Sequence, residues 1–334
     1  MPANLASPGS SGERPPRGAR HDDATYGPRC LVSNAKSSAH PRRLVVVPKP
    51  LTLLPTVVEP ADPATQDAES RAIARRIELA RAEHAHGIAV VAEALGGSPH
   101  EVSWVANPSA HDLAGADLVI TIGGDGTFLT VARHVVETPL FGVNSSPSTS
   151  TGHYCAATAA TFAERLDDVL ADRVRSSVLT RIAVEVDADD AGPTPVALPA
   201  LNDVLFAHRV PVASTRYALK LGDHSELQLS SGIWVATASG STGAMGSAGG
   251  EIMRVDDPRL QFRVREPYTR GTTTPTLLSG FVDRLEIVSR NDKNALFLDG
   301  HAEPVAVPFG ARAIIRRAAT PLHAFLAWLW EDKV

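Results

Sequence analysis

The chain has 334 residues, 43% of them hydrophobic and 21% charged, so it is long enough for two globular domains, each with its own core. Its formal net charge of −5 argues against a general nucleic-acid-binding protein. No stretch approaches the roughly 20 apolar residues of a membrane span, and two cysteines are too few for a disulfide framework. We therefore expect a cytoplasmic protein without nucleic-acid or membrane partners.

The first half of the chain alternates between short apolar runs and amphipathic stretches. Residues 1–41 are rich in Pro, Gly, Ser and Arg, without hydrophobic periodicity, and are expected to form a disordered tail. A capping box of Thr161 and Glu164 is expected to begin one of the helices. Strands that alternate with helices predict an α/β domain with a parallel sheet. The expected strands are 44–47, 102–105, 118–122 and 140–144, and the expected helices are 73–95, 128–135 and 161–172.

The second half of the chain changes to a period of two. Apolar residues alternate with polar ones at 182–186, 217–221 and 260–264, and turns rich in Gly, Pro and Asp separate further short apolar runs. This pattern predicts a β-rich domain resembling a sandwich or a barrel. An isolated terminal helix does not suit an all-β domain, so we expect the last helix to return to the first domain. Its apolar face is formed by Leu322, Phe325, Leu326 and Leu329.

A glycine-rich turn, Gly123–Thr127, connects the expected strand 118–122 to the helix that follows it. Its three glycines lack the Cβ atoms that would hold a substrate away from the backbone. Thr127 is expected to cap the helix, whose free N–H groups can bind an anion. Asp125 places a carboxylate in the middle of this turn. Such a carboxylate can accept a proton, hold a sugar hydroxyl or help to place a metal ion.

A second stretch of small residues, 237–250, follows another apolar run. Its hydroxyls can contact a phosphate or a ribose, but tight packing or a flexible loop would also use small residues. The stretch matches neither the Walker A nor the G-x-G-x-x-G pattern. Earlier in the chain, the pair Asn202–Asp203 forms either a turn or a contact to a nucleoside. A basic cluster after the second stretch can balance phosphate charge: Arg254, Arg259, Arg263, Arg265 and Arg270.

Together, these segments resemble the motifs of the NAD kinase family. The resemblance implies a Rossmann-like domain over residues 42–175, a returning helix within 318–334 and a β-rich nucleotide-binding domain over 176–317. The polar segment Asn144–Gly152 is closer to the plant and organellar NADH-kinase branch of the family. In chain order, the resembling segments are Gly123–Thr127, Gly142–Asn144, Asn202–Asp203, Ser239–Thr242 and Ser247–Gly250.

The resemblance implies an enzyme that phosphorylates the adenosine ribose 2′-hydroxyl of NAD⁺ or NADH, with ATP as donor and Mg²⁺ or another divalent cation as cofactor. Asp125 would be the essential acid, acting as a base or orienting the substrates, and no residue is assigned directly to the metal. The resemblance also implies a dimer or a tetramer. The residues expected to bind the nucleotides are Gly123, Gly124, Gly126, Thr127, Phe128, Asn144, Asn202, Asp203, Thr237, Ser239, Gly240, Ser241, Thr242 and Gly243.

Two other functions stay open from the sequence. Kinases of lipid or sugar hydroxyls carry similar Gly-Gly-Asp-Gly turns, although no strongly amphipathic basic helix suits a lipid surface here. The other is a nucleotide-binding regulator without turnover, because three positions depart from the family pattern. Asp203 stands in place of a glutamate, Ala244 in place of a tyrosine and Ser231 in place of an acidic residue. The intact Asp125 argues against a regulator without turnover.

Overall fold

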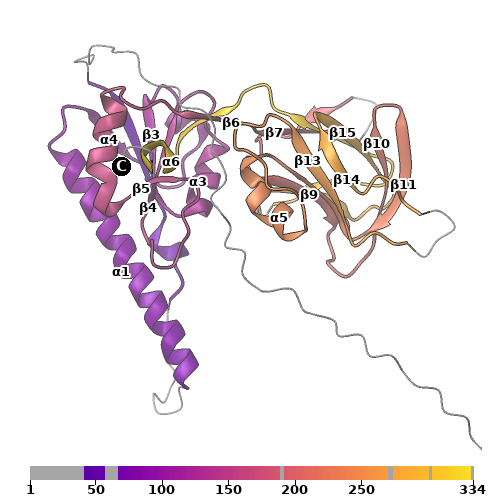
Figure 1. Ribbon diagram of the computed structural model, residues 1–334, viewed down its shortest axis with the longest axis horizontal. Coiled ribbons are helices and arrows are strands. Elements are labelled where there is room, and N and C mark those ends of the chain that lie inside the picture. Colours follow the sequence, from indigo (N-terminus) through magenta and orange to yellow (C-terminus); the bar gives the residue numbers. More distant parts are fainter. Residues whose placement is uncertain (1–40, 57–66, 189–191, 270–273, 301–302, 332–334) are drawn as a thin grey trace, which may run out of the picture.

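The protein consists of two domains that lie side by side (Figure 1). The first combines helices with a mostly parallel sheet, and the second consists of two antiparallel sheets, so the predicted fold class is confirmed. The tail predicted at the start of the chain lies outside the described residues, except for Pro41. The computed structural model describes residues 41–56, 67–188, 192–269, 274–300 and 303–331.

A seven-stranded sheet forms the centre of the first domain. Its strands are β1 (Arg43–Pro48), β2 (Glu101–Trp104), β3 (Leu118–Gly123), β4 (Leu140–Asn144), β5 (Cys155–Thr158), β6 (Ser177–Leu179) and β19 (Leu322–Phe325). They lie in the order β2-β1-β3-β4-β19-β6, and β5 pairs with Gly142–Asn144 of β4, beyond the two residues that pair with β19. Only the pair of β19 with β6 is antiparallel. Ligands bind such sheets at the carboxyl ends of the strands, and here β3 ends directly in the first glycine-rich turn.

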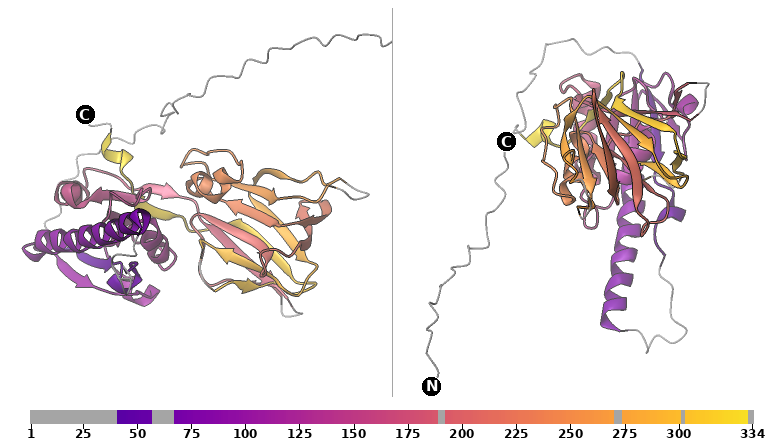
Figure 2. Two further views of the ribbon diagram at one scale, coloured as in Figure 1. Left: turned by 90° about the horizontal axis from the view of Figure 1, so that it is seen from below. Right: turned by 90° about the vertical axis from the view of Figure 1, so that its right-hand side faces the viewer.

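Helices cover both faces of this sheet, as its continuously apolar strands require. The helices are α1 (Ala68–Gly96), α2 (Ala110–Leu113), α3 (Asp125–Ala132), α4 (Phe162–Leu170) and α6 (Trp328–Glu331), with the 3-10 helices η1 (Leu51–Leu53) and η3 (Ala159–Thr161). Side chains of α1, α4 and α6 share one core, and those of α2 and α3 share another. The N-terminal half of α1 extends well beyond the sheet (Figures 1 and 2). None of the described helices is both long enough and apolar enough to cross a membrane.

The second domain is a sandwich of two six-stranded sheets whose inner faces share one core. The first sheet contains, in chain order, β7 (Ile182–Asp187), β8 (Thr194–Pro195), β10 (Thr215–Leu221), β11 (His224–Ser230), β15 (Arg284–Ser289) and β18 (Arg312–Arg317). The second sheet contains β9 (Asp203–His208), β12 (Gly232–Ala236), β13 (Leu260–Arg265), β14 (Ser279–Val282), β16 (Asn294–Leu298) and β17 (Val305–Ala306). The second glycine-rich stretch follows β12 as the 3-10 helix η4 (Ser239–Thr242) and the short helix α5 (Ala244–Ser247).

The chain crosses between the domains twice, and the buried side chain of Arg181 lies at both crossings. Its guanidinium donates to the carbonyl oxygens of Val135, just beyond α3, and of Thr320 and Pro321, just before β19. Burial lowers the pKa of Arg181. This buried guanidinium, which lies on one crossing, binds main-chain oxygens of the other crossing and of the first domain, so it links the two crossings.

Two local predictions were wrong. The pattern at Leu322–Phe325 was assigned to the final helix, but this segment is β19, and the final helix α6 contains only Trp328–Glu331. Apolar spacing in a run this short fits a strand as well as a helix. The return to the first domain holds, because the Trp330 indole donates to Asp168 of α4 at 2.8 Å. Thr161 is the N-cap residue of α4, but the expected capping box is not formed, because its hydroxyl makes no capping hydrogen bond and accepts the N–H of Thr158.

Candidate functional site

The first glycine-rich turn is a direct passage from β3 into α3. Gly124 is the N-cap of α3, and Asp125 is its first residue, so the prediction that Thr127 caps the helix was wrong. A Cβ atom on Gly123 would lie 2.2 Å from Thr127 Oγ1, and one on Gly124 would lie 2.6 Å from Ser150 Oγ. A Cβ atom on Gly123 would also lie 2.7 Å from Thr127 Cβ, so a larger residue there would displace Thr127, whereas one at Gly124 would displace only the Ser150 hydroxyl.

The side chain of Asp125, at the start of α3, is held by the residue that precedes β5. Its Oδ1 accepts the backbone N–H of Tyr154 at 2.8 Å. Within the described ranges, no hydrogen bond to Oδ2 is made, so this oxygen is available to a ligand. Burial lowers the pKa of the neighbouring His153, although the charge of Asp125 opposes this shift. Asp125 therefore lies beside a neutral imidazole.

A cavity of about 660 Å³ opens beside this turn, which is within the usual size of a ligand pocket. Its polar end is formed by the turn and by the loop after β4, and its apolar wall by α1 and the segment around η1. All lining residues belong to the first domain. They include Lys49, Pro50, Leu53, Leu54, Ile73, Arg76, Ile77, His84, Gly124, Asp125, Gly126, Thr127, Ser145 and Ser150.

His84 joins three parts of this cavity. It is buried, and its Nε2 donates to the carbonyl oxygen of Lys49 at 2.9 Å, because a carbonyl can only accept. Its Nδ1 accepts from the Ser145 hydroxyl at 2.7 Å. Burial is the main cause that lowers its pKa, so the ring is neutral with this tautomer. In the sequence, His84 lies within the expected helix 73–95 and belongs to none of the motifs.

Tyr154 connects the first glycine-rich turn to the second domain. Its main-chain N–H binds Asp125, and its hydroxyl donates to the Asn202 side chain. The ring stacks on Phe128 with centroids 5.1 Å apart, so a core residue of α3 fixes its position. Burial raises the pKa of Tyr154, which therefore stays a neutral donor. Two motifs that are distant in sequence are thus joined through one side chain that the sequence did not indicate.

Asp299 holds the Asn202–Asp203 motif in place. Its carboxylate accepts the backbone N–H groups of Leu201, Asn202 and Asp203 at 2.7, 2.8 and 3.1 Å. Burial, and then the charge of Asp299, raise the pKa of Asp203 to about 7. Burial also raises the pKa of Asp299, while its three N–H donors and the nearby Arg133 lower it. In the sequence, Asp299 belongs to none of the motifs.

The second glycine-rich stretch uses most of its hydroxyls internally. The Thr237 hydroxyl donates to Leu201 O at 2.6 Å, and the Ser241 hydroxyl to Ala238 O at 2.7 Å, and both side chains are fully buried. A Cβ atom on Gly240 would lie 2.1 Å from the carbonyl oxygen of Asn202. The small residues therefore let this stretch pack against the Asn202 main chain. Thr242, by contrast, is exposed.

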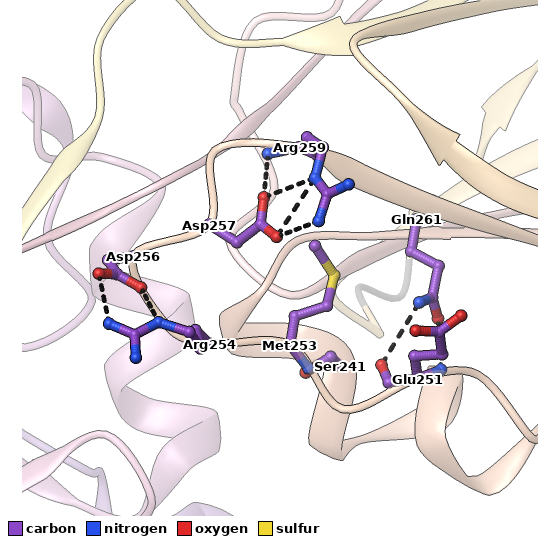
Figure 3. A network of polar contacts seen from close by, with 8 residues as sticks. All are labelled: Ser241, Glu251, Met253, Arg254, Asp256, Asp257, Arg259 and Gln261. Carbon is purple, nitrogen blue, oxygen red and sulfur yellow. Dashed lines mark hydrogen bonds and ion pairs between the residues drawn. The ribbon is translucent and has the colours of Figure 1, made fainter. Parts of the chain in front are cut away.

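The segment after α5 also forms a hydrogen bond to this stretch, and Figure 3 shows the residues involved. The Met253 N–H donates to Ser241 Oγ at 2.9 Å. Two arginines of the predicted phosphate-balancing cluster are already paired: Arg254 with Asp256 at 3.1 Å and Arg259 with Asp257 at 2.7 Å. Arg270 lies outside the described residues.

The predicted nucleotide residues divide into three groups. Gly124, Asp125, Gly126 and Thr127 line the cavity together. Asn202 is linked to them through Tyr154, and Asp203, Thr237, Ser239, Gly240 and Ser241 lie around it. Gly123 and Phe128 are buried without lining the cavity, Asn144 holds the loop 145–152 through Ser146 and Ser150, and Thr242 and Gly243 lie on the surface.

Among the described residues, no group of three or more His, Cys, Asp or Glu side chains is arranged to hold a metal ion. Of the described residues that line the cavity, Asp125 is the one with a carboxylate. A cation such as Mg²⁺ commonly uses only one or two protein carboxylates when a nucleotide supplies phosphate oxygens. The residues present therefore suit a cation that arrives with a nucleotide, and do not suit a cage made by the protein alone.

Comparisons with known proteins agree with this geometry. Residues 59–174 match the family model of the ATP-NAD kinase N-terminal domain. A probable NADH kinase from Oryza sativa subsp. japonica is 35% identical over 60% of this chain and 68% of its own length. An NADH kinase from Arabidopsis thaliana is 31% identical over 73% of this chain and 84% of its own length.

Solved structures show the same fold. An NAD kinase from Archaeoglobus fulgidus in complex with ATP has a TM-score of 0.60 at 21% identity, covering 87% of this chain and 96% of that one. Yeast NADH kinase complexed with NADH also has a TM-score of 0.60, at 17% identity, covering 86% of this chain and 84% of that one. At these identities the likeness concerns the arrangement of the two domains.

Proposed function

This chain belongs to the NAD kinase family, and from that premise we propose that it transfers the γ-phosphoryl group of ATP to the adenosine ribose 2′-hydroxyl of NAD(H). One observation carries the proposal for the site. Asp125 lines the cavity of the first domain and, through Tyr154, is connected to Asn202 of the second domain. Transfer between two bound nucleotides requires the reacting groups to be held together, and a carboxylate that lines the cavity and is linked to Asn202 suits that arrangement.

The cavity is the donor site in this proposal. Its turn is open at Gly126, where a Cβ atom would meet no atom within 4 Å, and the first N–H groups of α3 favour phosphate oxygens. Its apolar wall, with Leu53, Ile73 and Ile77, suits the flat face of a base. The phosphate chain would then lie at the end of the cavity where Asp125 is found.

NAD(H) is placed on the other side of Asp125, against the second domain. Asn202 is half-buried, and Asp299 fixes its main chain. The Tyr154 hydroxyl donates to the Asn202 side-chain oxygen, so the amide N–H groups of Asn202 are the part of this side chain that can donate to a ligand. Asp203 lies next to it with a raised pKa, and as a neutral acid it can donate to a ribose oxygen.

Asp125 accepts the proton in the proposed reaction. Its Oδ2 takes the proton of the 2′-hydroxyl as the bond from that oxygen to the γ-phosphorus forms. The bond from the γ-phosphorus to the bridging oxygen breaks, and its electron pair leaves with ADP. The Tyr154 N–H holds Oδ1 during this step, so the carboxylate keeps its orientation.

Mg²⁺ or a similar divalent cation is part of the proposal. It would be held by the Asp125 carboxylate and the donor phosphates, and it supplies charge neutralisation when bound. A reducing compartment such as the cytoplasm suits the buried free thiol of Cys155, whose pKa burial raises. A homo-oligomer, either a dimer or a tetramer, stays a prediction from the family resemblance.

A kinase of lipid or sugar hydroxyls is not favoured, because the matched family is that of the NAD kinases and the relatives are named NADH kinases. The test is to incubate the purified full chain with ATP, Mg²⁺ and either NAD⁺ or NADH. NADP(H) is then detected with a dehydrogenase specific for NADP. We expect product with at least one redox form, and its absence with both, in a protein that binds ATP, would reject the proposed function.

A further inference from the structure

Lys49 is held at the edge of the cavity by its main chain on both sides. Its N–H donates to Ile122 O at 2.8 Å, directly before the glycine turn, and its carbonyl accepts from His84 at 2.9 Å. The half-buried side chain lines the cavity together with Gly124 and Asp125. Its backbone is therefore fixed by β3 and α1, and its position relative to the turn is set by the fold.

The ammonium of Lys49 has no ionic partner in the part of the chain that the structure describes. Burial is the largest influence on the pKa of His84, and the hydrogen bond to the Lys49 carbonyl is the second. The positive charge of Lys49 is the third, and it lowers this pKa. The ammonium thus lies near the imidazole that borders the cavity. A half-buried cation without a counter-ion suits an anionic ligand.

Other cations that could bind a phosphate are less suitable than Lys49. Arg254 and Arg259 were expected to balance phosphate charge, but Asp256 and Asp257 already neutralise them. The cavity itself contains Arg76 as a second cation, but Arg76 is exposed on α1 and therefore more strongly screened by water. Lys49 is the better-placed cation for a phosphate at the inner, polar end.

We propose that Lys49 is a catalytic residue that binds the terminal phosphates of the donor nucleotide in this cavity. The inference rests on the proposed donor site. The ammonium pairs with non-bridging phosphate oxygens and keeps its proton throughout, so it adds charge neutralisation without changing the bonds that form and break. His84 acts as a positioning residue, because it holds the Lys49 carbonyl and is neutral.

The first test measures binding by calorimetry with ATP, ADP and AMP. Lys49→Met keeps the length and removes the charge, Lys49→Arg keeps the charge, and Lys220→Met, in β10 of the second domain, is the matched control. Loss of one charge-assisted contact predicts that Lys49→Met weakens ATP binding about tenfold to hundredfold while AMP binding changes less than about twofold. Lys49→Arg and Lys220→Met should bind ATP much as the wild type does.

Equal losses for ATP and AMP in Lys49→Met, or unchanged ATP binding, would overturn the proposal. A second measurement uses the unaltered protein, in case the variant does not fold. An amine-acetylating reagent is applied with and without ATP, and modification is read by mass spectrometry. ATP should protect Lys49 but not Lys220, and AMP should protect neither. Protection of neither lysine by saturating ATP would contradict the assignment.

Turnover separates this inference from the proposed function. If the wild type forms NADP(H), Lys49→Met should raise the KM for ATP and leave the KM for NAD(H) within about twofold, since only the donor contact is lost. If the wild type forms no NADP(H), the proposed function fails, while ATP binding and protection still decide whether Lys49 contacts phosphate.

Discussion

The two glycine-rich segments have similar compositions, but they differ in what their small residues do. Most residues of the turn Gly123–Thr127 line the cavity. Among them is Asp125, whose carboxylate has one oxygen without a hydrogen-bond partner among the described residues. In the stretch 237–250, the buried hydroxyls bind main-chain atoms, and Gly240 packs against the Asn202 carbonyl. The first segment leaves space for a ligand, and the second fills space to hold a neighbouring motif.

The largest expected effect concerns the first segment. Asp125→Asn keeps the shape and an oxygen that can accept the Tyr154 N–H, but removes the proton acceptor. We expect kcat to fall by about a hundredfold to ten-thousandfold. The melting temperature should change little, and calorimetry should still detect ATP binding. A variant with near-normal kcat would remove Asp125 from the role of base.

A matched pair of glycine substitutions tests the difference between the segments. Gly240→Ala places a Cβ atom against the Asn202 main chain, so we expect it to destabilise the protein by about 1–3 kcal/mol and to raise the KM for NAD(H). The Cβ atom in Gly126→Ala meets no atom within 4 Å, so the free energy of unfolding should stay the same or rise by about 0.5–1 kcal/mol. Chemical denaturation measures both. Equal destabilisation would contradict the comparison.

The hydroxyls of the second segment provide a smaller test. Ser241→Ala removes the acceptor of the Met253 N–H and the donor to Ala238 O, which should lower the free energy of unfolding by about 1–2 kcal/mol. Thr242→Ala alters an exposed residue, so the change should stay within about 0.5 kcal/mol. Urea unfolding of the two variants gives the answer. A larger loss in Thr242→Ala would mean that this hydroxyl, too, is structural.

A further effect is a pH dependence at Asp203, which lies between the two segments in the chain. Folding raises its pKa from 3.8 to about 7, so the native state binds more protons than the unfolded state over this interval. Stability from this group therefore falls as the pH rises from about 4 to about 7. In Asp203→Asn the dependence is absent, so the melting temperature of the variant should gain on the wild type across the interval. Parallel melting curves at every pH would refute the raised pKa.

The sequence predicted both domains, the strand that leads into the first turn and the order of the motifs, because apolar periodicity and glycine position are local signals. It did not predict how the motifs meet. Tyr154 lies in a segment without any motif, and Asp299 stood in an ordinary hairpin turn. Lys49 directly follows β1 and belongs to none of the motifs. Their roles come from tertiary contacts between residues far apart in the chain, which periodicity does not record.

The closing part of the chain shows the same limit. Leu322 and Phe325 fit a helical face, but they lie in a strand that enters the sheet between β4 and β6. The whole second domain separates β19 in the chain from its neighbours β4 and β6 in the sheet. A short apolar run is decided by such a long-range pairing, since its local preference is weak.

The measurement that most directly tests the account is a crystal structure of the full chain with NAD(H) and a non-hydrolysable ATP analogue. We expect the terminal phosphate beside Gly124–Thr127 in the first-domain cavity, and the 2′-oxygen of NAD(H) within about 2.6–3.2 Å of the Asp125 carboxylate. If the analogue bound instead against the stretch 237–250, or the 2′-oxygen lay beyond reach of Asp125, the assignment of donor and acceptor sites would be contradicted.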